Sequence, residues 1–172
     1  MDSIHWIVLA FMFIFLWATW RRNIFRAPIK GIQHRIEARW LDSYQTKFNN
    51  RMRGRKEALI LSGLSKMTEE VGRPLDVLDI GAGCGANFAY LPDGTNVTCL
   101  DPNQQCGDYI KKNAAGFPHI RLAEYHVGFA EDMAAIETGS MDAAICTLVL
   151  CSVCNVDKCL QEVIRVLRPV GI

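Results

Sequence analysis

The longest apolar stretch of the chain lies close to its N-terminus, where Ile4 to Trp20 contains only two polar residues. This run of 17 residues has the minimum length for a helix that crosses a bilayer. Arg21 and Arg22 follow it directly, and basic flanks favour the cytosolic side of a membrane. The pattern predicts an uncleaved membrane anchor, residues 1–30 with the basic flank, which either spans the membrane or embeds from one side.

Two other kinds of segment also show a long apolar run. A cleaved signal peptide begins with basic residues and ends at small ones, whereas this segment begins with Asp2 and ends at arginine. A buried core helix is the second alternative, and the aromatic, charge-free composition of the run argues against it. The predicted anchor would contact membrane lipid through Ile4 to Trp20.

A second apolar pattern follows, in which large residues recur at every fourth position from Ile32 to Met52. This spacing predicts an amphipathic helix after an interruption at Pro28 and Gly31. Its apolar stripe fits core packing, and close to an anchor it also fits a helix that lies on the membrane or covers an active site. Basic residues between positions 51 and 56 fit either a solvated face or contact with anionic head groups. With a helical continuation from Glu57 to Met67, residues 31–73 form the expected second region.

Four shorter segments downstream are apolar or alternate between apolar and polar residues, as strands of a sheet do. They are Leu75–Ile80, Asn96–Leu100, Ile120–Val127 and Ala143–Leu150. Helical patterns occupy Ala86–Leu91 and Val156–Arg168. Strands that alternate with helices predict an α/β fold with a parallel sheet in residues 74–172.

The turn after the first predicted strand is the candidate ligand-binding site. Asp79 is followed by Gly81, Gly83 and Gly85, a spacing that lets the backbone approach a ligand closely. Gly81 and Gly83 with Ala86 also satisfy the relaxed dinucleotide fingerprint. A nicotinamide cofactor is therefore an alternative at this point.

Acidic residues follow the next two strands. Asp101 ends the second strand about 20 residues after the glycines, where a carboxylate accepts hydrogen bonds from ribose hydroxyls; because Pro102 follows, a helix N-cap is the alternative. Glu131 or Asp132 after the third strand is a candidate acceptor for an adenine amino group. The alternative is a helix N-terminus, which also favours acids.

Composition narrows the class of protein. The net charge is +1, so bulk charge does not indicate a nucleic-acid partner. Seven cysteines, an odd number scattered along the chain, suit a reducing compartment better than a disulfide framework. Cys151 and Cys154 are spaced as a redox pair or half a metal site, but no second pair or suitably spaced histidine accompanies them, so a structural role is favoured.

Taken together, the ordered motifs resemble those of class I S-adenosylmethionine-dependent methyltransferases. They are the glycine run after Asp79, Asp101, Glu131-Asp132-Met133, Ser140-Met141-Asp142 and Leu167-Arg168-Pro169. The N-terminal run and the blocks Val97–Asn103 and Cys146–Val153 resemble more closely the membrane-anchored methyltransferase-like seven family, the microsomal alkyl-thiol S-methyltransferases. The resemblance runs the whole length of the chain, and the order of its motifs disfavours the nicotinamide alternative.

The resemblance implies a Rossmann-like α/β fold and methyl transfer from S-adenosylmethionine to small thiols. It also implies a domain that faces the cytosol at the endoplasmic reticulum and lipid droplets. The expected cofactor contacts are Asp79, Gly81, Gly83, Gly85, Asp101, Asn103, Asp132, Met133 and Cys146. Neither a catalytic residue nor a metal ligand is predicted; His126 lies near the expected cofactor edge, but a lone histidine is more often structural.

Compared with that family, the chain is expected to lack the last strands of the sheet, because it ends at Ile172 shortly after Pro169. The second functional hypothesis is therefore a catalytically silent membrane or lipid-droplet protein that keeps only the cofactor-binding half. In both cases Ala143–Leu150 would form an open apolar sheet edge, which is a site for pairing or aggregation.

Overall fold

The computed structural model describes residues 26–169, and the apolar run Ile4 to Trp20 of the predicted anchor lies outside them. Within this range no helix is both long enough and apolar enough to cross a membrane. The chain divides into two compact units, Met1–Glu37 and Ala38–Ile172. The described residues of the first unit begin helix α2 (Arg26–Lys56), and all other elements belong to the second unit.

The helical region before the sheet is continuous. Helix α2 passes into a π-helical turn, η1 (Glu57–Leu61), and then into α3 (Ser62–Val71), which ends at Gly72 with a left-handed φ of 71°. The expected interruption at Pro28 and Gly31 is wrong, because the helix already begins at Arg26. Proline fits the first turn of a helix, where its missing N–H has no partner to lose.

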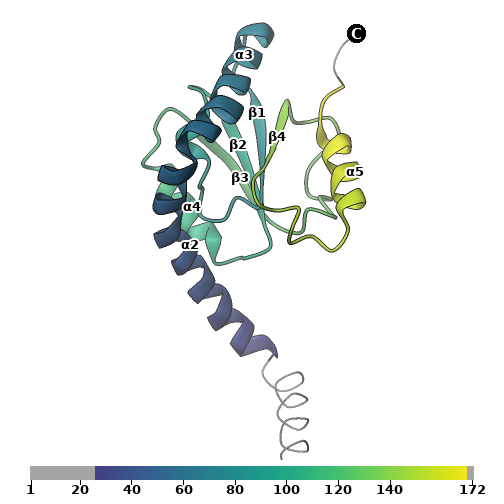
Figure 1. Cartoon of the computed structure of the whole chain (residues 1–172). Helices are drawn as coiled ribbons and strands as arrows, with labels where there is room; N and C mark the ends of the chain where they lie inside the picture. Colours follow the sequence, from purple (N-terminus) through teal and green to yellow (C-terminus); the bar gives the residue numbers. More distant parts are fainter. Residues whose placement is uncertain (1–25, 170–172) are drawn as a thin grey trace, which may run out of the picture. The chain divides into compact units, whose positions relative to one another are not determined.

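The four strands form one parallel sheet in the order β3-β2-β1-β4 (Figure 1). Three strands are found where the sequence predicts them: β1 (Asp76–Ile80), β2 (Asn96–Asp101) and β3 (Arg121–Val127). The fourth, β4 (Ala143–Cys146), begins at the predicted residue and covers half of the predicted range. Because β1 and β2 are central, both of their faces are buried. The apolar residues Val77, Leu78, Val97 and Leu100 are therefore buried, although polar residues stand between them in both strands.

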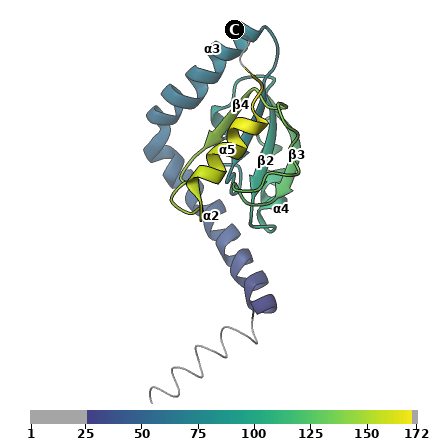
Figure 2. The same cartoon turned by 90° about the vertical axis from the view of Figure 1, so that its right-hand side faces the viewer.

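Side chains of β1 alternate between two cores. Val77 packs on the face that α3 and α4 (Cys106–Ala114) cover, together with Phe88 and Ile110. Leu78 and Ile80 pack on the opposite face, which α5 (Val156–Val166) covers. Figure 1 shows α4 and α5 on opposite sides of the sheet, and Figure 2 looks onto the side that carries α5.

Three local differences from the predicted elements concern the segments next to the glycine loop. The segment expected as a helix from Ala86 forms only a 3-10 turn, η2 (Phe88–Tyr90), because Pro92 and Gly94 end it. Strand β4 stops at Cys146, and Leu148 takes a left-handed φ of 59°. Strand β4 pairs with β1 alone among the described residues, so the open edge is shorter than expected. Helix α4 was not predicted.

A buried carboxylate joins the first strand to the end of α5. The Asp142 side chain accepts the N–H of Asp76 at 2.8 Å and pairs with the guanidinium groups of Arg73 and Arg168. Burial by itself would raise the pKa of Asp142, but Arg73, the Asp76 N–H and Arg168 together lower it to about 2. Asp142 therefore stabilises the fold as a carboxylate.

This carboxylate predicts a pH dependence of stability. The folded pKa lies below the unfolded value, so the stabilisation is complete above the unfolded pKa and is lost as the pH falls through the folded pKa. In urea unfolding, we expect the wild type to lose about 2 kcal/mol more than Asp142→Asn between pH 5 and pH 2. Parallel pH curves for the two proteins would contradict this role.

Candidate functional site

The loop between β1 and η2 favours glycine at three positions. Gly81, Gly83 and Gly85 have φ values of 63°, 56° and 87°, which side chains disfavour. A Cβ atom at Gly81 would lie 2.3 Å from Cγ2 of Val149, whereas a Cβ at Gly83 would meet open space. The loop therefore presents bare backbone toward space that a ligand can enter.

Asp101 holds this loop from the end of β2. Its Oδ2 accepts the N–H of Gly83 at 2.9 Å, and its Oδ1 accepts the N–H of Asn103 at 2.8 Å. Helix α4 begins at Cys106 with Gln105 as its N-cap, so the alternative role of Asp101 as a helix N-cap is wrong. The carbonyl of Asn103 accepts the hydroxyl of Tyr125 at 2.7 Å. Asp101 and Asn103 thus meet the glycine loop at the carboxyl edge of the sheet.

Asp79 lies fully buried at the end of β1. Its Oδ1 accepts a hydrogen bond of 2.9 Å from Nδ2 of Asn87. Its Oδ2 has no hydrogen-bond partner within the described part of the chain. Burial raises the pKa of Asp79 to about 7, against the opposing effects of Asn87 and Lys56. Because buried polar atoms normally have partners, this oxygen indicates a missing donor.

The segment after β3 does not begin a helix, so the helix N-terminus that was the alternative for Glu131 and Asp132 is wrong. Phe129 and Asp132 form an isolated antiparallel bridge. The Glu131 carboxylate accepts the N–H groups of Cys154 and Asn155, the residues before α5. The Cys154 hydrogen bond is the main reason that the pKa of Glu131 is lowered. Glu131 therefore fastens the N-terminal end of α5.

Met133 and Asp132 are less closely tied to the glycine loop. Met133 is buried in the core beneath α5, and its N–H donates to Oε2 of Glu162 at 2.7 Å. The side chain of Asp132 is exposed. The predicted cofactor contacts of Asp132 and Met133 stay predictions. The Met133 N–H already donates to Glu162 in this structure.

The end of β4 closes the other side of the loop. Cys146 lies opposite Ile80 in the sheet register, and burial raises the pKa of its thiol. The hydroxyl oxygen of Thr147 lies 3.5 Å from Nδ2 of Asn87. His126 is not part of this group, because its Nε2 pairs with Oε2 of Glu124 at 2.7 Å.

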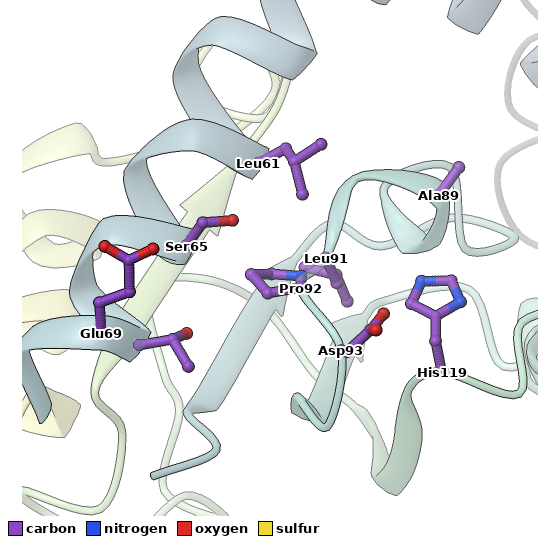
Figure 3. Close-up of a pocket in the computed structure, with 9 residues that line it drawn as sticks. Leu61, Ser65, Glu69, Ala89, Leu91, Pro92, Asp93 and His119 are labelled. Atoms are coloured by element: carbon purple, nitrogen blue, oxygen red, sulfur yellow. The ribbon is translucent and has the colours of Figure 1, made fainter. Parts of the chain in front are cut away.

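A hollow of about 620 Å³ lies at the opposite, amino edge of β2 and β3 (Figure 3). Glu69 of α3 lines it on one side, and Asp93 and His119 lie beside each other on the other side. The N–H of Gly94 donates to the carbonyl of His119 at 2.7 Å and joins these two loops. This hollow contains none of the predicted cofactor contacts.

Asn87, Lys56 and Asn49 contribute to the site although sequence analysis did not select them. Asn87 stands eight residues after Asp79 as a polar side chain between the glycines and an apolar segment, which is a weak signal. Lys56 ends a basic run and looks like one more solvated cation. Nothing in the local sequence distinguishes Asn49.

The strand order, glycine loop and acidic strand end define a Rossmann-like α/β domain. The family model described as a methyltransferase domain matches residues 78–172, more than half of the chain. The chain therefore belongs to this methyltransferase domain family, and the predicted fold class is confirmed.

Among solved structures, a protein of the S-adenosylmethionine-dependent methyltransferase class from Methanococcus maripaludis has a TM-score of 0.59 at 16% identity, covering 80% of this chain and 60% of that one. The CurJ carbon methyltransferase has a TM-score of 0.57 at 20% identity, covering 67% and 32%. Both likenesses concern the fold alone.

Curated relatives are more similar in sequence. The human thiol S-methyltransferase TMT1B is 43% identical over 126 residues, which cover 73% of this chain and 51% of the relative. The human thiol S-methyltransferase TMT1A is 37% identical over 145 residues, covering 82% and 59%. The resemblance to thiol methyltransferases is thus confirmed, and the chain spans about half the length of these relatives.

Proposed function

We propose that this chain binds S-adenosylmethionine at the glycine loop and transfers its methyl group to a small thiol. The observation that carries the proposal is the fully buried Asp79, whose Oδ2 lacks a donor next to a glycine loop held by Asp101. A buried anionic oxygen without a partner fits a cationic amino group such as that of the cofactor. The open space at Gly83 fits the close approach of a ligand.

In this proposal each residue has a binding role. Asp79 accepts from the amino group of the cofactor, and Asp101 accepts from the ribose hydroxyls. The glycine loop provides contact without side chains, and Asn103, Asp132, Met133 and Cys146 remain the further predicted contacts. When bound, S-adenosylmethionine supplies a methyl group on a sulfonium that is already activated. The protein then has mainly to align the acceptor with it.

The thiol acceptor is inferred from the relatives. Both human relatives bear the name thiol S-methyltransferase. A thiol attacks as the thiolate, and an unperturbed thiol has a pKa of about 8.5. Lowering the pKa of the bound thiol therefore matters more for the reaction than a strong base. The structure assigns no residue to such a base.

Calorimetric titration of the purified full chain in detergent tests the cofactor, with S-adenosylmethionine and NAD as the two ligands. We expect saturable binding of S-adenosylmethionine and none of NAD. Methylation of a small alkyl thiol, followed by mass spectrometry, then tests the transfer. Binding without methylation would support the silent cofactor-binding protein, and binding of NAD alone would overturn the proposed cofactor.

We further propose that the protein lies at the endoplasmic reticulum membrane and lipid droplets, with its domain in the cytosol. The apolar run Ile4 to Trp20 supports this proposal. So does α2, where the exposed rings of Trp40 and Tyr44 stack with centroids 4.8 Å apart. Lys47 and Arg51 follow at helical spacing on the same face, as suits lipid head groups. Imaging of the tagged full chain with and without residues 1–30 tests it; an unchanged distribution would overturn it.

A further inference from the structure

A buried lysine of helix α2 lies against the exit of the glycine loop. Lys56 is only 4% exposed. Its Nζ donates to Oδ1 of Asn87 at 2.7 Å, to Oδ1 of Asn49 at 2.8 Å and to the carbonyl of Ala86 at 3.0 Å. An ammonium group has three N–H donors, so these three acceptors use all of them. A lysine with every proton assigned inside the protein is not a solvated surface cation.

The lysine determines how the Asn87 amide is turned. Because Oδ1 of Asn87 accepts from Lys56, its Nδ2 is directed to Oδ1 of Asp79, at 2.9 Å, and lies 3.5 Å from Oγ1 of Thr147. The opposite orientation would place the NH₂ group against the ammonium and an oxygen against the carboxylate. Asn87 therefore engages one oxygen of Asp79 and leaves the other one, Oδ2, without a partner among residues 26–169.

A second residue of α2 acts on the same turn. Nδ2 of Asn49 donates to the carbonyl of Ala86 at 2.8 Å, so this carbonyl accepts from both Asn49 and Lys56. The Lys56 ammonium also lies 5.4 Å and 5.2 Å from the ring centroids of Phe48 and Tyr90, a distance at which aromatic rings attract cations. Helix α2 thus holds the end of the glycine loop through its side chains.

We propose that Lys56 is a positioning residue for the cofactor: it orients Asn87, and through Asn87 it presents Asp79 to the amino group of the bound ligand. This role rests on the proposed binding of S-adenosylmethionine at the glycine loop. Lys56 itself does not touch the cofactor. Its effect passes along one chain of hydrogen bonds, from Nζ to the Asn87 amide to the Asp79 carboxylate.

The hydrogen-bonded series Lys56, Asn87 and Asp79 predicts a measurable pH dependence of cofactor binding. The titratable groups that face Asp79 are Lys56 from α2, Asp101 and Cys99 from β2, and Cys146 from β4. Burial raises the pKa of Asp79, and the positive charge of Lys56 opposes that rise. Binding of a cationic ligand requires ionised Asp79, so affinity falls as the pH drops through the pKa of Asp79. Without the lysine charge that pKa is higher, and the loss of affinity begins at a higher pH.

Titration of the full chain with S-adenosylmethionine between pH 6 and pH 8 tests the role of Lys56. In Lys56→Met, we expect the Kd at pH 7.5 to rise at least tenfold and the acidic limb of the binding curve to move to higher pH. Arg39→Met is the matched control, because this arginine of the same helix is exposed; both its Kd and its pH profile should equal those of the wild type. A Lys56→Met protein with wild-type affinity and profile would overturn the proposal.

A double-mutant cycle separates positioning from a general structural role. If Lys56 acts through Asn87, adding Lys56→Met to Asn87→Ala should cause little further loss of affinity. Fully additive losses would overturn the proposal. If Lys56→Met does not fold, Asn87→Leu tests the link between Lys56 and Asp79, because it removes the donor to Asp79 without placing a second negative charge beside it. Wild-type affinity in Asn87→Leu would refute the positioning role, and no binding by the wild type would refute the proposed function together with it.

Discussion

Replacing Asp101 by alanine is expected to weaken S-adenosylmethionine binding at least about a hundredfold. The carboxylate accepts the N–H groups of Gly83 and Asn103, and hydrogen bonds to a charged group contribute about 1.5–3 kcal/mol each. Its removal takes away the proposed acceptor for the two ribose hydroxyls and also the support of the loop. Since about 1.4 kcal/mol corresponds to a tenfold change in Kd, losing two ribose hydrogen bonds to a charged group gives this magnitude.

The control for Asp101→Ala must remove the same charge without touching the loop. Asp108→Ala meets this condition, because Asp108 is exposed on α4. Calorimetry should give wild-type affinity for the control, while circular dichroism checks that both variants are folded. A folded Asp101→Ala protein that binds within threefold of the wild type would show that the ribose role is wrong.

Replacing Gly81 by alanine is expected to destabilise the protein by about 3 kcal/mol. The left-handed backbone costs an L-residue about 1–2 kcal/mol, and overpacking costs about 1–3 kcal/mol. The added methyl group would lie 2.3 Å from Cγ2 of Val149, so one atom must move. Urea unfolding of the full chain measures this change in the free energy of unfolding.

Gly83 provides the matched control within the same loop. Its φ is also left-handed, at 56°, but a Cβ there meets open space. Gly83→Ala should therefore lose only the backbone contribution of about 1–2 kcal/mol, although it should also weaken cofactor binding by filling the space the ligand needs. Val149→Ala in the Gly81→Ala background should recover part of the loss. Equal destabilisation by the two alanines would contradict the contact with Val149.

The sequence by itself determined the positions of the four strands, their parallel arrangement and the glycine loop. Burial of β1 and β2 on both faces favours short apolar clusters such as Val77-Leu78, and a left-handed turn favours glycine. Asp101 could be predicted at the cofactor edge from its spacing after the glycines, whereas its contact with Gly83 came from the structure. The strands and the glycine loop depend on residues that are neighbours along the chain, so the local pattern of apolar, polar and glycine residues predicts them.

Only the tertiary structure decided the roles of several polar residues. Lys56 reads as one cation of a basic run, yet its partners Ala86 and Asn87 lie 30 and 31 positions away. Glu131 was a candidate for the cofactor, whereas it holds the residues before α5, 23 and 24 positions away. Hydrogen bonds over such separations depend on how helices pack against the sheet, and hydrophobic periodicity carries no information about which polar groups then meet.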